Sequence, residues 1–196
     1  MELPPKVQAA FGTLLGAFFV VSLVELQAVT GGRRAYADGA LAFGTPLFLV
    51  ALIVLALQLG LTFRLRRDPA DVAERYGSRG LYRIHLAMGG LSLGVALLHV
   101  AHSWSARRIG PEVLYDVLRS DLGAPRWLFA YLIGLTAACF FFGQGFASVL
   151  RSWGLVFSDA RPARWVGWAG AVGLWLLGLN ALSHFAVGAP ILWGAA

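Results

Sequence analysis

Long apolar stretches separated by short polar connectors dominate this chain. Five of the stretches reach about 20 residues, the length that an α-helix needs to cross a hydrocarbon core of about 30 Å. We predict membrane-spanning helices at 7–29, 41–63, 81–104, 127–150 and 165–187. Because the connectors are short, residues 1–196 are predicted to form one transmembrane domain of the all-α class, a bundle of five helices.

The connector between the third and fourth predicted helices shows a different pattern. From Pro111 to Leu122, apolar and charged residues recur at helical spacing on opposite sides. The apolar side carries Val113, Leu114, Val117 and Leu118, and the charged side carries Glu112, Asp116, Arg119 and Asp121. Proline is tolerated in the first turn of a helix, and amphipathic helices of this kind lie in the membrane interface. We therefore predict a short interfacial helix here.

The composition supports an integral membrane protein. Of the 196 residues, 58% are hydrophobic and 13% are charged, and the mean hydropathy is +0.70, well above that of a soluble domain. The net charge of +6 comes from arginines that flank apolar stretches, so we expect lipid headgroups and a cytoplasmic protein as counterparts, and no nucleic acid. The series Gly167, Gly170 and Gly173 predicts a close approach between helices.

The distribution of cations predicts an orientation. Ten cations lie in the connectors on the side of the N-terminus, against six on the other side. By the positive-inside rule, the N-terminus is cytoplasmic and the C-terminus is outside, as a multi-pass protein of a bacterial-type inner membrane. The first stretch is too long, and too poor in flanking basic residues, for a cleaved signal peptide, so we expect it to remain as a spanning helix.

A series of short motifs occupies the C-terminal two thirds of the chain. They are Gly89-Gly90-Leu91 with His99, Tyr131-x-x-Gly134, Phe140-x-Phe142-x-x-Gly145 and Ser152-Trp153-Gly154. In order and spacing, these motifs resemble the five-helix, single-subunit, di-haem b558-type cytochrome b anchor of succinate:quinone oxidoreductases and fumarate reductases, the complex II family. The resemblance is clearest over residues 81–175 and becomes vague over the first two predicted helices.

The resemblance implies a respiratory membrane anchor. Such an anchor holds a flavoprotein and an iron–sulfur subunit at the cytoplasmic face and passes electrons between their clusters and a quinone. We expect quinone as a cofactor, menaquinone in type, although the residues themselves do not define the quinone. The anchor performs no chemistry on succinate or fumarate, so the resemblance implies no catalytic residue in this chain, and the direction of the reaction does not follow from it.

Most of the haem ligands that the resemblance implies are replaced. Two haems in this family need four axial histidines, one on each of the first four helices. The first two predicted helices contain no histidine, Phe141 stands at the ligand position of the fourth, and His99 remains on the third. Two haems are therefore excluded with these residues alone. The cluster Phe140–Phe142 could instead fill the volume of a porphyrin.

The four histidines of the chain leave room for at most one haem b, and equally for none. His85 and His99 are about 21 Å apart along one helix, and His85 is interpreted as an interfacial histidine. Similar depth in the membrane favours His99 or His102 with His184 as a haem pair, so His99 and His184 are the candidate ligands of a haem iron. Against this, the fifth helix of the family tends to lie beside the haem bundle.

Other polar residues inside the apolar stretches are candidates for quinone chemistry, because polar groups in lipid are costly. Glu25, near the outer face, could carry a quinone proton, or could be a snorkelling or protonated side chain. A second set lies towards the cytoplasm and could hydrogen-bond a quinone carbonyl: Gln58, His85, Gln144, Ser148 and Trp153. Hydrogen bonding between helices explains this set equally well.

Two other classes of function remain open. One is an independent b-type cytochrome that carries electrons with His99 or His102 and His184, which would show a haem spectrum without partner subunits. The other is a redox-silent scaffold subunit, which would show neither haem nor sensitivity to quinone. Co-purification with flavin and iron–sulfur subunits distinguishes the anchor from both.

Overall fold

The computed structural model describes the backbone of residues 5–64, 76–155, 161–189, 191 and 192. Within the helices, the side chains of residues 5, 6, 8, 25, 39–48, 58, 61–64, 107 and 161 lie outside the description. The elements are α1 (Pro5–Leu26), the 3-10 helix η1 (Gln27–Gly31), α2 (Gly32–Arg64), α4 (Arg79–Ile109), α5 (Pro111–Leu122), α6 (Pro125–Ser152) and α7 (Arg161–Val187). Every element in the described part of the chain is a helix, which confirms the all-α prediction.

Within the described residues, four segments are long and apolar enough to cross a membrane. They are Ala9–Asp38, Arg79–Ala106, Pro125–Ser152 and Pro162–Val187. The last three contain the predicted spans 81–104, 127–150 and 165–187. The predicted span 41–63 lies on α2, much of which is outside the described side chains, so a fifth span stays a prediction. By helix length and composition, the chain is a multi-pass membrane protein.

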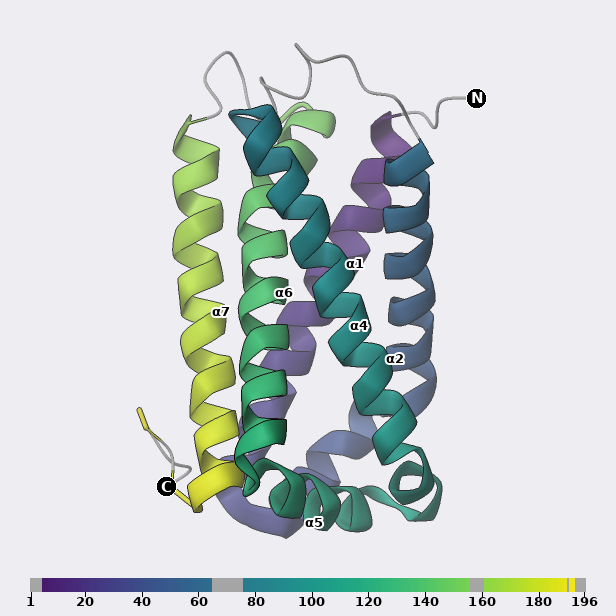
Figure 1. Ribbon diagram of the computed structural model, residues 1–196, viewed down its shortest axis with the longest axis vertical. Helices are drawn as coiled ribbons and strands as arrows, with labels where there is room; N and C mark the ends of the chain where they lie inside the picture. Colours follow the sequence, from purple (N-terminus) through teal and green to yellow (C-terminus); the bar gives the residue numbers. More distant parts are fainter. Residues whose placement is uncertain (1–4, 65–75, 156–160, 190, 193–196) are drawn as a thin grey trace.

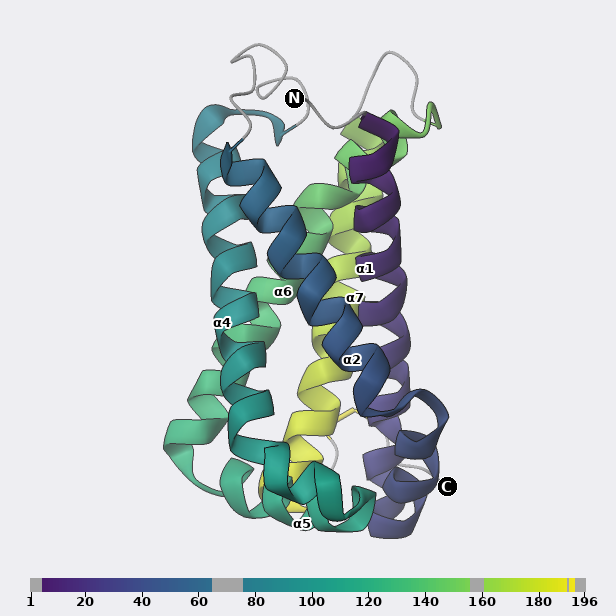
Figure 2. The same cartoon turned by 90° about the vertical axis from the view of Figure 1, so that its right-hand side faces the viewer.

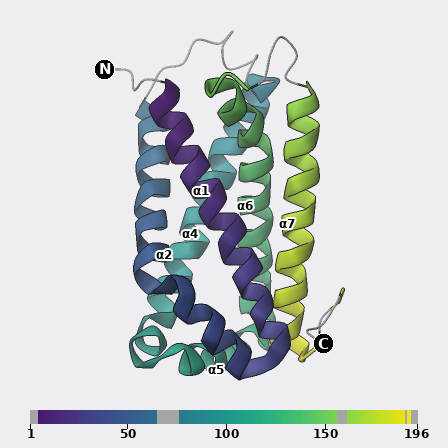
Figure 3. The ribbon, with the colours of Figure 1, turned by 180° about the vertical axis from the view of Figure 1, so that it is seen from behind.

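The long helices run alternately up and down, and α5 lies across one end of the bundle (Figure 1). The reversal between α1 and α2 lies at the same end (Figure 3). It follows η1 and uses Gly32, whose φ of 87° favours glycine. The α2 helix therefore begins well before the predicted residue 41, because the polar segment Arg33–Asp38 is helical too.

Four helices form a ring in the order α1, α2, α4 and α6, with α6 returning to α1. In the described part of the chain, the diagonal pairs, α1 with α4 and α2 with α6, do not contact each other. The fifth long helix, α7, packs outside the ring, mainly against α6 (Figures 1 and 2). This arrangement leaves space along the centre of the ring.

Close contacts between α6 and its neighbours occur at glycines. A Cβ atom on Gly167 of α7 would lie 2.7 Å from the carbonyl oxygen of Gly143 on α6. A Cβ atom on Gly134 of α6 would lie 2.5 Å from Cγ1 of Val95 on α4. Small residues at such points let helix backbones approach within a membrane. The predicted role of Gly167 in close packing is confirmed, whereas Gly173 faces open space.

The short helix α5 buries one face against the end of the bundle. Its buried side chains are Leu114, Tyr115, Leu118 and Leu122. Tyr115 packs against Tyr36 of α2 and Phe185 of α7, with ring centroids 5.6 and 5.4 Å away. Arg33 of α2 adds ion pairs to Glu112 at 3.1 Å and Asp116 at 2.9 Å. The amphipathic helix is confirmed, and its depth relative to the membrane stays a prediction.

Candidate functional site

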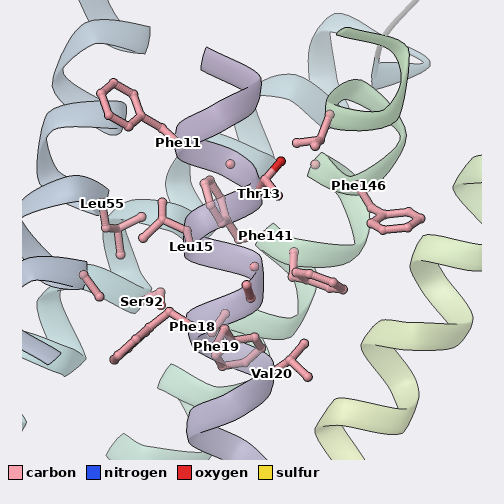
Figure 4. Close-up of a pocket in the computed structure, with 18 of the residues that line it drawn as sticks. Phe11, Thr13, Leu15, Phe18, Phe19, Val20, Leu55, Ser92, Phe141 and Phe146 are labelled. Carbon is pink, nitrogen blue, oxygen red and sulfur yellow. The ribbon is translucent and has the colours of Figure 1, made fainter. Parts of the chain in front are cut away.

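A cavity of about 1000 Å³ is lined by α1, α2, α4 and α6, and by Gly178 and Leu182 of α7. Its lining includes ten of the eleven residues from Phe11 to Val21, so it extends around α1 as well as between the helices of the ring. Its walls are mainly aliphatic and phenylalanine side chains, several of which come from α1 and α6 (Figure 4). This volume is at the upper end of the range for ligand sites in proteins. On α6 its lining extends from Tyr131 to Trp153, about 33 Å at 1.5 Å per residue, which matches the thickness of a hydrocarbon core.

The described residues that line this cavity include none with a charged side chain of the Lys, Arg, Asp or Glu type. Most of its few polar groups lie towards the end opposite α5. There Thr13 donates a hydrogen bond to the carbonyl oxygen of Ala9 (2.8 Å) and accepts one from Nε1 of Trp153 (3.0 Å). Ser152 donates a hydrogen bond to the carbonyl oxygen of Ser148 (2.9 Å). The cavity therefore suits an uncharged, largely apolar ligand.

At the end near α5, His99 of α4 and Tyr131 of α6 line the cavity together. Nδ1 of His99 and the hydroxyl group of Tyr131 are hydrogen-bonded, and the two rings meet edge to face with centroids 5.4 Å apart. The backbone of the same turn is tied by Ser103, whose hydroxyl donates a hydrogen bond to the carbonyl oxygen of His99 (2.6 Å). The two rings place a polar pair in an otherwise apolar part of the cavity.

Nearer the opposite end, His85 of α4 lines the same cavity and is buried. Its ring is stacked on Phe141 of α6, with centroids 4.3 Å apart and planes 9° apart. The Phe141 ring also lies against Gly89, where an added Cβ atom would come within 2.7 Å of it. The residue at the ligand position that the family resemblance implies thus packs its ring directly on the facing histidine.

The three phenylalanines of α6 do not fill one common volume. Phe140 meets Trp168 of α7 at 5.1 Å, Phe141 meets His85 of α4, and Phe142 meets Phe19 of α1 at 6.3 Å between ring centroids. Phe141 and Phe142 both line the large cavity, whereas Phe140 does not. That these side chains occupy the volume of a porphyrin therefore stays a prediction for Phe141 and Phe142, which leave a large cavity beside them.

The residues expected to bind quinone divide between two cavities. His85, Ser148 and Trp153 line the large cavity. Gln144 is buried and donates a hydrogen bond from Nε2 to the carbonyl oxygen of Tyr76 (2.8 Å). It lines a second cavity of about 450 Å³, together with Arg164, Trp165 and Trp168 among others. Tyr76 lines both cavities. The side chain of Gln58 lies outside the described residues.

The structure does not bring together the expected haem pair. Nε2 of His102 lies 2.9 Å from Oδ2 of Asp121, and its ring lies 4.4 Å from that of Trp127. His184 is on α7, which α6 separates from α4 (Figure 1), and the described backbones of α4 and α7 do not come close to each other. Neither His102 nor His184 lines the large cavity. The pairing of His99 or His102 with His184 is therefore not supported.

Two further polar residues, which were expected near the outer face, serve to connect helices. Asn180 of α7 is fully buried and donates a hydrogen bond to Oε1 of Gln27 (3.2 Å), while Nε2 of Gln27 donates to the carbonyl oxygen of Leu177 (2.8 Å). These bonds join η1 to α7. The side chain of Glu25, the candidate proton carrier, lies outside the described residues.

The residues of the large cavity do not fit a haem held by two histidines. Such a haem needs imidazoles from facing helices. The sequence has no histidine in α1, α2 or α6, and the two histidines that line the cavity, His85 and His99, both come from α4. They face Phe141 and Tyr131. The described lining also offers no cation for the two carboxylates of a haem, and no group of three or more metal-ligating side chains occurs in the described residues.

Sequence reasoning missed Tyr131 as a functional candidate. The position of Tyr131 along its helix could have identified it. His99 is ten residues before the end of α4, and Tyr131 is six residues after the start of α6. Helices that run in opposite directions place two such positions at similar height.

Comparison with known proteins completes the description of the site. No family model matches the chain, and no solved structure matches it. The chain is 24% identical over 181 residues to a curated protein, the succinate dehydrogenase cytochrome b558 subunit of Bacillus subtilis (strain 168). The match covers 87% of this chain and 90% of that protein. The chain is therefore a distant, near-full-length homologue of a succinate dehydrogenase cytochrome b558 subunit.

Proposed function

We propose that this chain is the membrane anchor subunit of a succinate:quinone oxidoreductase-type complex. The observation that carries the proposal is the match over 87% of this chain and 90% of the relative, which is named as a subunit of succinate dehydrogenase. A match of that extent concerns the whole bundle rather than one apolar helix. The anchor acts as a single transmembrane domain in a bacterial-type inner membrane, with a flavoprotein and an iron–sulfur subunit as partners.

The partner subunits bind at the end of the bundle opposite α5. Four described arginines lie at the helix ends there: Arg79, Arg83, Arg151 and Arg164. A cation-rich end is expected on the cytoplasmic side, and it can pair with acidic residues of a partner. The other end has five described arginines, but four carboxylates lie at the same end and offset most of that charge: the arginines are Arg33, Arg34, Arg108, Arg119 and Arg126, and the carboxylates are Asp38, Glu112, Asp116 and Asp121. Arg33 is paired with Glu112 and Asp116. This contrast in net charge supports docking at the end opposite α5.

Quinone reduction belongs at the same end, because electrons from an iron–sulfur cluster need a nearby acceptor. Gln144 and Arg164 line the smaller cavity there, next to the arginines. The anchor supplies an apolar site and hydrogen-bonding groups, and the partner subunits supply the electrons. Glu25 and Gln58 remain candidate residues for proton transfer and for quinone binding. We propose no electron transfer through haem in this chain, and at most one haem.

Charge reversal at the two ends of α4 tests the docking. Arg83→Glu changes an exposed arginine at the proposed docking end, and Arg108→Glu changes an exposed arginine of the same helix at the opposite end. We expect Arg83→Glu to lower the yield of co-purified flavin and iron–sulfur subunits severalfold and Arg108→Glu to leave it unchanged. The reverse pattern would show that the orientation is wrong. A wild-type chain that purifies without these subunits would refute the anchor function.

A further inference from the structure

Electrons that cross this bundle from end to end have to travel the thickness of a membrane. The part of the chain from Tyr131 to Trp153, which lines the large cavity, extends for about 33 Å at 1.5 Å per residue. Electron transfer over such a distance is fast only where redox centres stand along the way. In helical bundles, such centres are held by ligand side chains on facing helices. The side chains that the helices present to each other therefore decide whether electrons can cross.

Ring contacts occupy both places where α4 presents a histidine to the large cavity. The imidazole of His85 is stacked on Phe141, with centroids 4.3 Å and planes 9° apart, so a porphyrin cannot lie between these two rings. Packing is tight at this point, because a Cβ atom on Gly89 would come within 2.7 Å of Phe141. His99 is in direct contact with Tyr131 of α6. Neither histidine therefore has a second imidazole opposite it.

The other side chains that bind the iron of haem or of iron–sulfur clusters are not placed to replace the missing histidines. Cysteine, methionine and tyrosine are such ligands, but Tyr131 is already hydrogen-bonded to His99. Cys139 packs with Leu23 in a buried cluster and does not line the large cavity. Met88 is on α4, the helix that carries both histidines, and does not line the cavity either. The single cysteine of the sequence cannot by itself supply the ligands of an iron–sulfur cluster. The described residues therefore provide no relay from one end of the bundle to the other.

In the proposed anchor function, the electron donor and the electron acceptor lie at the same end. The iron–sulfur subunit docks at the end opposite α5, next to the smaller cavity that Gln144 and Arg164 line. Oxidation of succinate to fumarate releases two electrons and two protons, and reduction of a quinone to a quinol takes up the same number of each. The described lining of the large cavity has no Lys, Arg, Asp or Glu side chain that would carry protons along the bundle. Electrons and protons are thus both available on the side opposite α5.

We propose that the complex works on one face of the membrane, so that neither electrons nor protons cross the bundle during turnover. The reaction is then electroneutral, and its rate does not respond to a transmembrane potential. This inference rests on the proposed function and adds that the anchor does not couple the reaction to the potential. The alternative is a proton supply from the opposite face, for example through Glu25, which would move charge across the membrane.

Proteoliposomes test this inference. The purified complex, with its flavin and iron–sulfur subunits, is reconstituted with quinone, and succinate is added outside so that only outward-facing complexes react. Potassium gradients with valinomycin impose potentials of about 100 mV in either direction, and a voltage-sensitive dye verifies them. The initial rate of quinone reduction is measured with each sign and at zero potential. Complexes with Cys139→Ser and Met88→Leu are assayed in parallel, and the flavin content and visible spectrum of every preparation are recorded.

We expect rates that agree within about twofold under the three conditions, because each charge that crossed about 100 mV would change the equilibrium constant by about 50-fold. Turnover itself should give no dye signal, and Cys139→Ser and Met88→Leu should leave the rate and the spectrum unchanged. A rate that changes severalfold with the sign of the potential would overturn the inference, and so would the loss of a haem band in either variant. Absence of flavin and iron–sulfur subunits from the wild type would instead count against the proposed function.

Discussion

Two aromatic side chains of α6 meet the two histidines of α4 that line the large cavity. Phe141 stacks on His85, and Tyr131 is hydrogen-bonded to His99. A haem held by two histidines would need a second imidazole on the helix that faces α4. In both places α6 instead supplies the ring of a phenylalanine or a tyrosine. The cavity of a cytochrome-like bundle can therefore persist while its bis-histidine ligation is lost.

The haem content follows from these residues. Purified wild-type complex is expected to contain fewer than two haems per chain by a pyridine haemochrome measurement, because α1, α2 and α6 contribute no histidine. His184→Ala is expected to leave any haem content unchanged, since His184 does not line the large cavity. A stoichiometry near two would contradict this reading of the site. Loss of haem in His184→Ala would instead support His184 as a haem ligand, paired with His99 or His102.

Gln144 provides a test of the quinone site at residue scale. Gln144→Leu removes a side-chain amide from the lining of the smaller cavity. It also removes the hydrogen bond to the carbonyl oxygen of Tyr76. We expect about tenfold slower quinone reduction, on the scale of one or two lost hydrogen bonds, with unchanged electron transfer from the flavin subunit to a soluble dye. Thr136→Val is the control, since Thr136 lies on the same helix and lines neither cavity. An unchanged rate of quinone reduction in Gln144→Leu would mean that the substrate quinone does not bind in the smaller cavity.

At the scale of elements, α6 organises the bundle through close contacts with α1, α4 and α7. The backbones of α6 and α7 approach each other closely, because Gly143 and Gly167 face each other without side chains between them. In lipid, helix association depends on such packing rather than on burial from water. The α5 helix closes one end of the ring with a buried apolar face and the ion pairs of Arg33.

A pair of matched glycine variants on α7 tests this packing. Gly167→Ala would bring a Cβ atom to 2.7 Å from a backbone oxygen of α6, whereas a Cβ atom on Gly173 meets nothing within 4 Å. Overpacking of this kind costs about 1–3 kcal/mol. The midpoint of thermal unfolding in detergent should therefore fall by several degrees for Gly167→Ala and stay near wild type for Gly173→Ala. Equal midpoints would mean that α6 and α7 are not in this close contact.

The elements were largely predictable from the sequence, and the site was not. The length of the apolar stretches predicted α4, α6 and α7. A proline followed by an amphipathic pattern predicted α5. The start of α2 was missed because Arg33, although polar, is held in the helix by carboxylates of α5. Tyr131 was missed because its partner His99 is 32 residues away in the sequence. Ring contacts between helices leave no local pattern along a chain.

At the scale of the whole molecule, the two ends of the bundle differ in charge and in covering. One end is closed by α5 (Figure 2). There Arg33 is paired with Glu112 and Asp116. The other carries arginines at the ends of α4, α6 and α7. Over the full sequence, ten cations lie on the side opposite α5 and six on the side of α5, which by the positive-inside rule supports a cytoplasmic end opposite α5 that meets the iron–sulfur subunit.

The central claim is that the chain anchors the flavin and iron–sulfur subunits of a succinate:quinone oxidoreductase-type complex at the membrane, and cell fractionation tests it most directly. Succinate dehydrogenase activity is measured with a soluble dye in the membrane and soluble fractions of cells with and without this chain. We predict that deletion moves the activity from the membrane fraction to the soluble fraction, and that expression of the wild-type chain returns it. Activity that stays in the membrane fraction after deletion would contradict the proposed function.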